Sequence, residues 1–546
     1  MTEQKLSDSR DVLGALYFKV GRWCEAEREQ RAVIELERVS HGPEHPHTLL
    51  SMNNLAATLD SLGRHEEALT LMSQVLATER RVLGAKHPDT ITGLKNLAAL
   101  HGNRAQWPEC YRLYRELMEL FRADLDDAHL AVTAACLAGE TNWARECLSV
   151  LQKEVASIPD PQAGRLLACA ALATPEVATN LEPVFQAAEA AFKAEPGLPI
   201  TGLYQGTADY RRGRWAEALR RLDPLRQHPN GLLAAEAGCF VAMALHQQGQ
   251  TAAARAALDT ASRRLDTFLR AGVLGTLLDQ ADRWHDAGRV ALLRAEAERL
   301  IHGRVVSRPL DAALLAEARL RWDPVRQAMI TAFQFAGQRK WGEARDAWLK
   351  AMAEPGFAWD TALEFENDLA LKMGMTFLRA NDRTNHTQLC RTLLAQARET
   401  HNPVTRFSTA LVALLDRDAN DLRQSATEAI AAASQENTDP DFAPWIGFAA
   451  GLANYRGGEH ARAIEALGDA EQSTQAWCKG PALAYRVLAL QQLSRTDEAR
   501  QSLNRAQELL AEPLKERPLD WRHWAPLEMA QWALDEAAAT LPPQKP

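Results

Sequence analysis

The residues best suited to chemistry are histidines and cysteines, the common zinc ligands and nucleophiles. The segment His45-Pro46-His47 places two imidazoles close together, but the related segment His87-Pro88-Asp89 has only one. A metal site is therefore not expected in either segment. Both segments come where a helix should begin, and Asp89 or Thr90 is expected to be the N-cap, whose side chain accepts from the first free backbone N–H groups.

The eight cysteines have no redox or metal spacing such as C-x-x-C, so they are expected to be reduced residues of a core. No local Cys–His pairing supports a nucleophile. The motifs G-x-x-x-x-G-K-[ST], G-x-S-x-G and H-E-x-x-H are also missing from the sequence. Neighbouring carboxylates such as Glu66-Glu67 and Asp126-Asp127 are expected to be solvated. The sequence thus predicts a chain that is not an enzyme, with no catalytic residue, no metal ligand and no cofactor.

Composition excludes several other classes of protein. With 546 residues, 46% of them hydrophobic, the chain has enough apolar side chains for a large core. No stretch approaches the roughly 18 uninterrupted apolar residues of a membrane span, and the polar start MTEQKLSDSR lacks the apolar run of a secretory signal. The formal net charge of −9 argues against a nucleic-acid partner, which would favour a basic balance. A cytoplasmic location is expected.

A repeat of 42 residues organises the first part of the chain, because the glycine, histidine, proline and threonine at 42, 45, 46 and 48 recur at 84, 87, 88 and 90. Leu55, Leu59 and Leu62 are spaced as on one face of a helix, and Gly63 breaks the pattern before a second helix. This is typical of a helical hairpin that occurs about three times between residues 8 and 130. Tryptophans mark the expected start of several second helices, at Trp23, Trp107, Trp215 and Trp341.

A longer duplication, with an offset of 245 residues, covers the rest of the chain. We predict a repeat array over 1–130, a divergent helical module over 131–305 and a second, duplicated module over 306–546. No segment alternates with period two over the length of a strand. The predicted fold is therefore all-α, a solenoid of tetratricopeptide-like hairpins. The matched residues are Gly206, Tyr210, Gly213, Ala218 and Leu222, which correspond to Gly451, Tyr455, Gly458, Ala463 and Leu467.

Polar residues of the first helices are the candidates for a partner-binding groove, because these helices line the concave side of such a stack. An asparagine side chain offers both a donor and an acceptor to a peptide backbone. The alternative is that each asparagine caps or packs within its own hairpin. The candidates, which lie on or just after the first helices, are Asn53, Asn54, Lys95, Asn96 and Asn103.

A basic stretch is the second candidate surface. Residues 283–345 carry 12 Lys and Arg against 7 Asp and Glu, a local excess of 12 − 7 = +5 in an acidic chain. Such a face would steer an acidic partner or an anionic membrane. The alternative is ordinary solvated helix surface. The residues singled out are Arg289, Arg294, Arg299, Arg339 and Lys340.

The first 125 or so residues resemble the tetratricopeptide repeats of kinesin light chains. The resemblance rests on the H-P-x-T loops at 45–48 and 87–90, the N-N-L-A helix at 53–56 and the L-G-x-x-H-P joint at 83–88. The rest of the chain resembles the divergent helical tails of large bacterial signalling proteins. The likeness to the bacterial kinesin light chains that accompany bacterial tubulins implies a non-enzymatic partner of a tubulin-like filament. It also implies that Asn53, Asn54 and Asn96 face a cargo-binding groove.

The leading functional expectation is thus a protein-interaction scaffold or adaptor that binds a tubulin-like cytoskeletal filament. A peptide-binding regulatory adaptor of a kinase-associated signalling system is the first alternative. A scaffold in weak contact with an anionic membrane, through the basic stretch and tryptophans near Trp521 and Trp524, is the second.

Overall fold

The computed structural model describes residues 3–19, 22–120, 125–155, 161–172, 177, 180–228, 230–270, 284–359, 369–399, 403–436, 442–473, 476–511 and 524–540. Within these ranges the regular structure is helical, with no strand, so the predicted all-α fold is confirmed. The chain divides into two compact units, Met1–Asp323 (unit 1) and Pro324–Pro546 (unit 2), and the boundary in the sequence falls within α16 (Ala312–Gly337).

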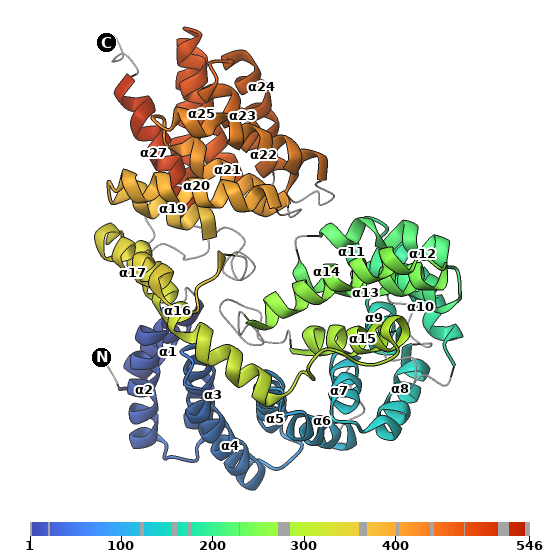
Figure 1. The fold of residues 1–546 in the computed structure, drawn as a ribbon. Helices are drawn as coiled ribbons and strands as arrows, with labels where there is room; N and C mark the ends of the chain where they lie inside the picture. Colours follow the sequence, from blue (N-terminus) through green and yellow to red (C-terminus); the bar gives the residue numbers. More distant parts are fainter. Residues whose placement is uncertain are drawn as a thin grey trace. The chain divides into compact units, whose positions relative to one another are not determined.

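Unit 1 is a succession of helical hairpins, in which each first helix packs against its own second helix and against the neighbouring pair (Figure 1). Its helices are α1 (Glu3–Lys19), α2 (Trp23–Ser40), α3 (Pro46–Ser61), α4 (His65–Val82), α5 (Pro88–Gly102), α6 (Trp107–Leu120), α7 (Leu125–Leu137), α8 (Thr141–Val155), α9 (Pro161–Leu172), α10 (Glu182–Ala194), α11 (Pro199–Arg211), α12 (Trp215–Leu222), α13 (Gly231–Gln247), α14 (Thr251–Arg270) and α15 (Trp284–His302), with a short 3-10 turn at Pro224–Gln227.

The H-P-x-T loops start the first helices, but their capping residue differs from the prediction. His45 and His87 are the N-caps, since their ring Nδ1 atoms lie 3.3 Å from the backbone N two residues ahead. The threonine instead turns back into the loop: Thr90 Oγ1 donates to the Gly84 carbonyl at 2.9 Å. Asp89 and Thr90 are therefore not the caps, because the imidazole already occupies the acceptor position.

The turn and tryptophan positions are as predicted. Gly63 has φ +80° in the turn between α3 and α4, a conformation that glycine adopts without strain. The four tryptophans of the repeated signature are the first residues of α2, α6, α12 and α17 (Trp341–Ala353). One of them, Trp107, is buried and donates through Nε1 to the Leu310 carbonyl at 2.7 Å, so it links α6 to the segment that precedes α16, 203 residues later.

Helix α15 closes the second half of unit 1 by packing on α13 and also returning to α7 and α5. Its first residue, Trp284, is fully buried, with its ring centroid 5.9 Å from those of both Trp107 and Tyr114. Glycine makes the approach feasible, because a Cβ on Gly102 would lie 2.6 Å from the Trp284 ring. The predicted segments 1–130 and 131–305 therefore lie within one compact unit.

Unit 2 repeats this arrangement: α27 (Trp524–Thr540) packs on α25 and also returns to α19 (Leu369–Arg379). The duplicated glycines make the same contact, since a Cβ on Gly206 would lie 2.6 Å from Leu222 and one on Gly451 would lie 2.6 Å from Leu467. The other helices are α20 (Arg383–Glu399), α21 (Pro403–Leu415), α22 (Arg423–Glu436), α23 (Ala443–Arg456), α24 (His460–Glu471), α25 (Ala476–Gln492) and α26 (Thr496–Leu510), with a 3-10 turn at Asn420–Leu422.

The two units close with different chemistry. In unit 1, Gly288 of α15 lies so close to α7 that a Cβ would be 2.5 Å from Leu137. In unit 2, buried Glu528 of α27 lies 2.6 Å from the Arg379 guanidinium of α19 and 2.5 Å from that of Arg339. A close apolar contact and a buried ion pair thus hold corresponding closing helices.

Candidate partner-binding surfaces

The predicted asparagines lie at the seam between α3 and α5. Asn96 Nδ2 donates to Asn53 Oδ1 at 3.1 Å, and Asn53 is buried. Asn54, Lys95 and Asn96 are half-buried, so each keeps some accessible surface. Lys95 Nζ lies 2.6 Å from Asp127, a buried carboxylate, so the expectation that Asp127 is simply solvated is wrong. The seam offers polar groups that are already fixed in place.

The groove prediction is wrong for Asn103. It is buried at the C-terminal cap of α5, and its carbonyl accepts from Arg319 at 2.7 Å. The next residue, Arg104, donates to Asp60, which also lies 2.7 Å from the His65 ring. Burial alone would raise the pKa of Asp60, but these two donors lower it. This turn therefore binds neighbouring hairpins together and does not face a groove.

The predicted basic face is wrong for two of its members, because Arg289 and Arg294 are only 4% and 3% exposed. Arg289 lies 2.8 Å from Glu236 and 2.9 Å from Asp286, and Arg294 lies 2.6 Å from Asp266. A buried cation needs a paired anion, because the pair offsets the cost of removing the charge from water. These two arginines therefore add no charge to an exposed basic face.

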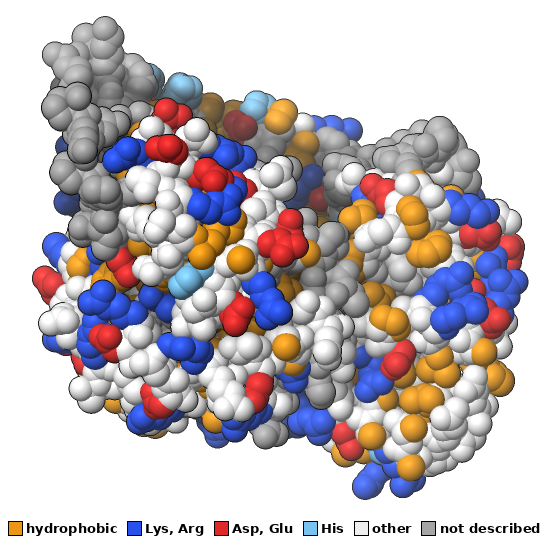
Figure 2. All heavy atoms as spheres, turned by 90° about the horizontal axis from the view of Figure 1, so that it is seen from above, with side chains coloured by type: hydrophobic (Ala, Val, Ile, Leu, Met, Phe, Trp, Pro, Cys, Tyr) orange, Lys and Arg blue, Asp and Glu red, His pale blue; other side chains and the backbone are white. Residues whose placement is uncertain are grey.

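The remaining three members differ from one another. Arg299, in unit 1, is exposed; in unit 2, Lys340 is exposed and Arg339 is half-buried beside Glu528. On the face seen in Figure 2, basic and acidic side chains are interspersed. Trp521 and the side chain of Trp524, which motivated the membrane alternative, lie outside the described residues.

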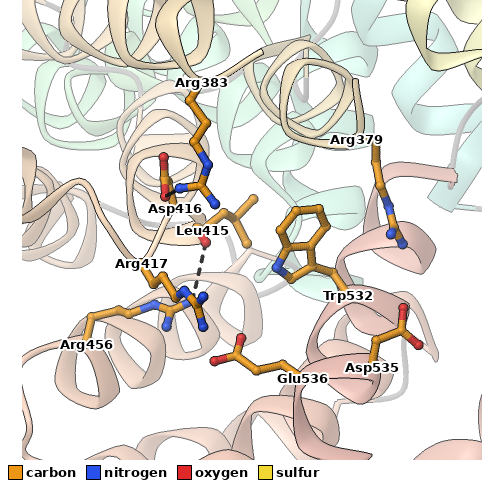
Figure 3. Close-up of a pocket in the computed structure, with 9 residues that line it drawn as sticks. All are labelled: Arg379, Arg383, Leu415, Asp416, Arg417, Arg456, Trp532, Asp535 and Glu536. Atoms are coloured by element: carbon orange, nitrogen blue, oxygen red, sulfur yellow. Dashed lines mark hydrogen bonds and ion pairs between the residues drawn. The ribbon is translucent and has the colours of Figure 1, made fainter. Parts of the chain in front are cut away.

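Unit 2 has a hollow of about 430 Å³ where the first helices α19, α21 and α23 end against α27 (Figure 3). Its arginines are already engaged: Arg383 lies 2.7 Å from Asp416, Arg456 donates to the Leu414 carbonyl at 3.0 Å, and Arg379 lies over the Trp532 ring at 5.2 Å. Sequence analysis did not single these residues out, since they come from helix ends far apart in the chain. These three arginines therefore already have partners within unit 2.

Beside that hollow, Cys390, His386 and Asp416 resemble a nucleophile, a base and an orienting acid. The Cys390 sulfur lies 3.7 Å from His386 Nε2, and His386 Nδ1 lies 3.8 Å from Asp416. Burial raises the pKa of the Cys390 thiol far above its usual range and lowers the pKa of His386 to about 4. A protonated, fully buried thiol is not activated. We therefore interpret Cys390 and His386 as residues of the core. The i, i+4 spacing of the pair was its one signal in the sequence.

The predicted core role holds for most cysteines but not for Cys24, which is exposed, and Cys136 is half-buried. Within the described ranges, no group of three or more His, Cys, Asp or Glu side chains is placed to hold a metal ion. No helix there is both long and apolar enough to cross a membrane.

A second hollow, of about 610 Å³, lies between α2 and α4 above α3. Its floor is apolar, formed by Ile34, Leu55, Leu59, Met52 and Leu71, of which the last two are half-buried. Charged side chains of α2 and α4 stand along both sides. All of these residues belong to the most regular part of the repeat array.

One buried carboxyl group differs in its hydrogen bonding from its counterpart in the preceding repeat. Glu37 accepts from Ser7 Oγ at 2.6 Å, whereas Oε2 of Glu79, its equivalent 42 residues later, has no hydrogen-bond partner among the described residues. Glu79 is 2% exposed, and burial, together with the nearby Asp89 charge, raises its pKa to about 7. A carboxyl whose pKa is raised on folding stabilises the fold below its unfolded pKa, and that stability is lost as the pH rises through about 7.

Replacing Glu79 by glutamine is therefore expected to increase the free energy of unfolding at pH 8 by about 1–3 kcal/mol and to flatten its pH dependence between roughly pH 4.5 and 7. The amide keeps the shape and cannot ionise. Urea denaturation at several pH values measures both effects. Glu37→Gln is the matched control and should give no such gain, since Glu37 is hydrogen-bonded. An unchanged pH dependence in the Glu79 variant would show that another group titrates.

Comparisons with known proteins give a family match to the N-terminal hairpins and likenesses to solved structures. Residues 9–80 match the tetratricopeptide repeat family model. No curated protein matches the chain. Kinesin-light-chain TPR-like repeats from Podosopora anserina align with 36% of this chain and 99% of that chain, at 21% identity and a TM-score of 0.32.

Two further structures show the same kind of likeness. A tetratricopeptide repeat protein from Parabacteroides merdae covers 48% of this chain and 93% of its own, at 14% identity and a TM-score of 0.36. A chain of the APC/C hetero-tetramer Cut9–Hcn1 covers 97% of this chain and 96% of its own, at 13% identity and a TM-score of 0.32. Values this low say nothing about partner or activity. Residues 9–80 thus carry the tetratricopeptide repeat, and the described chain has the architecture of a solenoid built from such helical hairpins.

Proposed function

We propose that the chain is a non-enzymatic scaffold that binds other proteins. The observation that carries this proposal is the seam of the N-terminal array, where Asn54, Lys95 and Asn96 stay partly accessible beside a hydrogen-bonded asparagine pair. Groups held in place by their neighbours lose little freedom when a partner binds. Stacked helical hairpins expose extended surfaces of this type, and tetratricopeptide repeat proteins are generally protein-interaction scaffolds.

The partner that we favour is a tubulin-like filament, on the basis of the likeness to kinesin light chains in the first 125 or so residues. A peptide segment from a regulatory, kinase-associated system is the second candidate. The apolar hollow between α2 and α4 favours this alternative, because a hollow of that size fits side chains of a short segment better than a filament surface.

Co-pelleting with polymerised bacterial tubulin across a salt series tests the filament proposal. We expect saturable binding at a fixed ratio, weakened by about threefold to tenfold in Asn54→Ala, which removes one or two hydrogen bonds. Ser73→Ala, an exposed change on α4, is the control and should bind as the original chain does. Absence of pelleting where the filament forms would shift the proposal to the peptide partner, sought by unbiased pull-down.

A further inference from the structure

The hollow between α2 and α4 lacks an ion pair that joins the corresponding helices of the next repeat. In the next repeat, Arg80 of α4 and Glu116 of α6 form an ion pair of 2.7 Å across the corresponding groove. The residues 42 positions earlier are Arg38 and Gln74, and a neutral amide cannot pair with the guanidinium charge. Arg38 instead contacts Glu35 on its own helix at 3.2 Å. The first groove therefore lacks the bridge that spans the second.

The Arg38–Glu35 contact leaves the cation available. The side chains of the two residues are 43% and 73% exposed, and exposed pairs three residues apart on one helix contribute little. A carboxylate supplied from outside at the Gln74 position would occupy the place that Glu116 takes beside Arg80. The open end of the groove is thus suited to an acidic group.

The opposite end of the groove has the opposite character. Arg64 bridges to α2 by lying 2.6 Å from Glu27, which also pairs with Arg31 at 2.7 Å, so those cations are satisfied. Glu66, further along the rim, is exposed and forms no ion pair with any residue in the described part of the chain. On α4, Glu66 and Gln74 are eight residues apart, about 12 Å along the helix axis. Between these ends lies the apolar floor.

We propose that this groove binds an amphipathic helical segment of a partner protein. The segment carries a carboxylate for Arg38 and a cation for Glu66, on one face and two turns apart, with two large aliphatic side chains between them for Met52 and Leu71. Charge at both ends fixes the direction of the segment, and the apolar floor supplies most of the affinity. This inference rests on the proposed scaffold function and adds a surface distinct from the Asn53–Asn96 seam.

The test uses the full chain and a fluorescein-labelled, alanine-based helical peptide with Lys and Glu seven residues apart and leucines at the third and fourth positions between them. We expect anisotropy to show salt-sensitive binding that weakens at least tenfold in Gln74→Glu, because the new carboxylate pairs with Arg38 and repels the peptide's glutamate. Glu116→Gln, which alters the neighbouring groove, is the matched control and should leave binding unchanged. Circular dichroism checks that both variants stay folded.

A charge swap makes the assignment specific. Arg38→Glu should bind a peptide with lysine in place of its glutamate better than it binds the original peptide, reversing the preference. Equal binding by the original chain and Gln74→Glu, or no loss when the leucines become alanine, would overturn the proposal, as would sedimentation showing that a second copy of the chain fills the groove. Co-pelleting that persists in Gln74→Glu separates failure of this groove from failure of the scaffold function.

Discussion

Replacing Trp284 by alanine is expected to lower the free energy of unfolding of unit 1 by about 3–5 kcal/mol, the range for removing a large, fully buried aromatic side chain. Trp284 is 0% exposed and lies between Trp107 and Tyr114. Its loss leaves a cavity where α15 meets α5 and removes the ring against which Gly102 packs. Urea denaturation of the full chain, followed by far-UV circular dichroism, measures the change.

Trp215→Ala is the control for this variant, because Trp215 is half-buried at the start of α12 and takes no part in the closure. It should cost less than half as much. Limited proteolysis of the Trp284 variant should cut unit 1 sooner than unit 2. A stability loss no larger than that of the control would mean that α15 is held by contacts other than this ring.

Replacing Glu236 by glutamine should destabilise unit 1 by about 3–5 kcal/mol, because it removes one partner of a buried ion pair. Glu236 and Arg289 side chains are 4% and 5% exposed, with Nη2 and Oε2 at 2.8 Å. After the change, Asp286, on the same helix at 2.9 Å, is the one carboxylate partner that the guanidinium keeps among the described residues. The main cost is the loss of the buried carboxylate, because the half-exposed Asp286 compensates the buried guanidinium charge less well.

The double variant Glu236→Leu with Arg289→Met separates lost charge from lost packing. Removing both partners with apolar groups of similar size should recover most of the stability, since no charge then stays buried alone. Thermal unfolding of the single and double variants makes the comparison. Equal losses in both would show that the geometry of the site, rather than its charge balance, is what stabilises α15.

The fold could be predicted from the sequence because each hairpin is specified locally. Gly63 in its turn, the leucine stripe of α3 and the tryptophan at the start of α2 all act within one repeat of 42 residues. The helices therefore follow from spacing alone. The same holds for the duplicated glycine contacts at Gly206 and Gly451.

The surfaces could not be predicted in the same way. Arg289 is buried because Glu236, 53 residues away, happens to lie opposite it in the folded unit, and no local pattern announces that pairing. The N-cap role of His87 depends on ring orientation rather than residue class. Asn53 is buried and accepts a hydrogen bond from Asn96, a contact between repeats. Pairings across helices decide exposure, and the sequence order does not contain them.

The contact between α15 and α7 distinguishes unit 1 from an open solenoid. An open solenoid is a one-dimensional stack in which hairpins can melt from either end, each held only by its neighbours. A contact between α15 and α7 makes residues more than a hundred positions apart depend on one another. The hairpins from α7 to α14 therefore cannot unfold singly until α15 detaches, whereas α1–α4 lie outside this closure. A partner bound at the N-terminal repeats would therefore contact hairpins that can unfold locally while the rest of unit 1 stays folded.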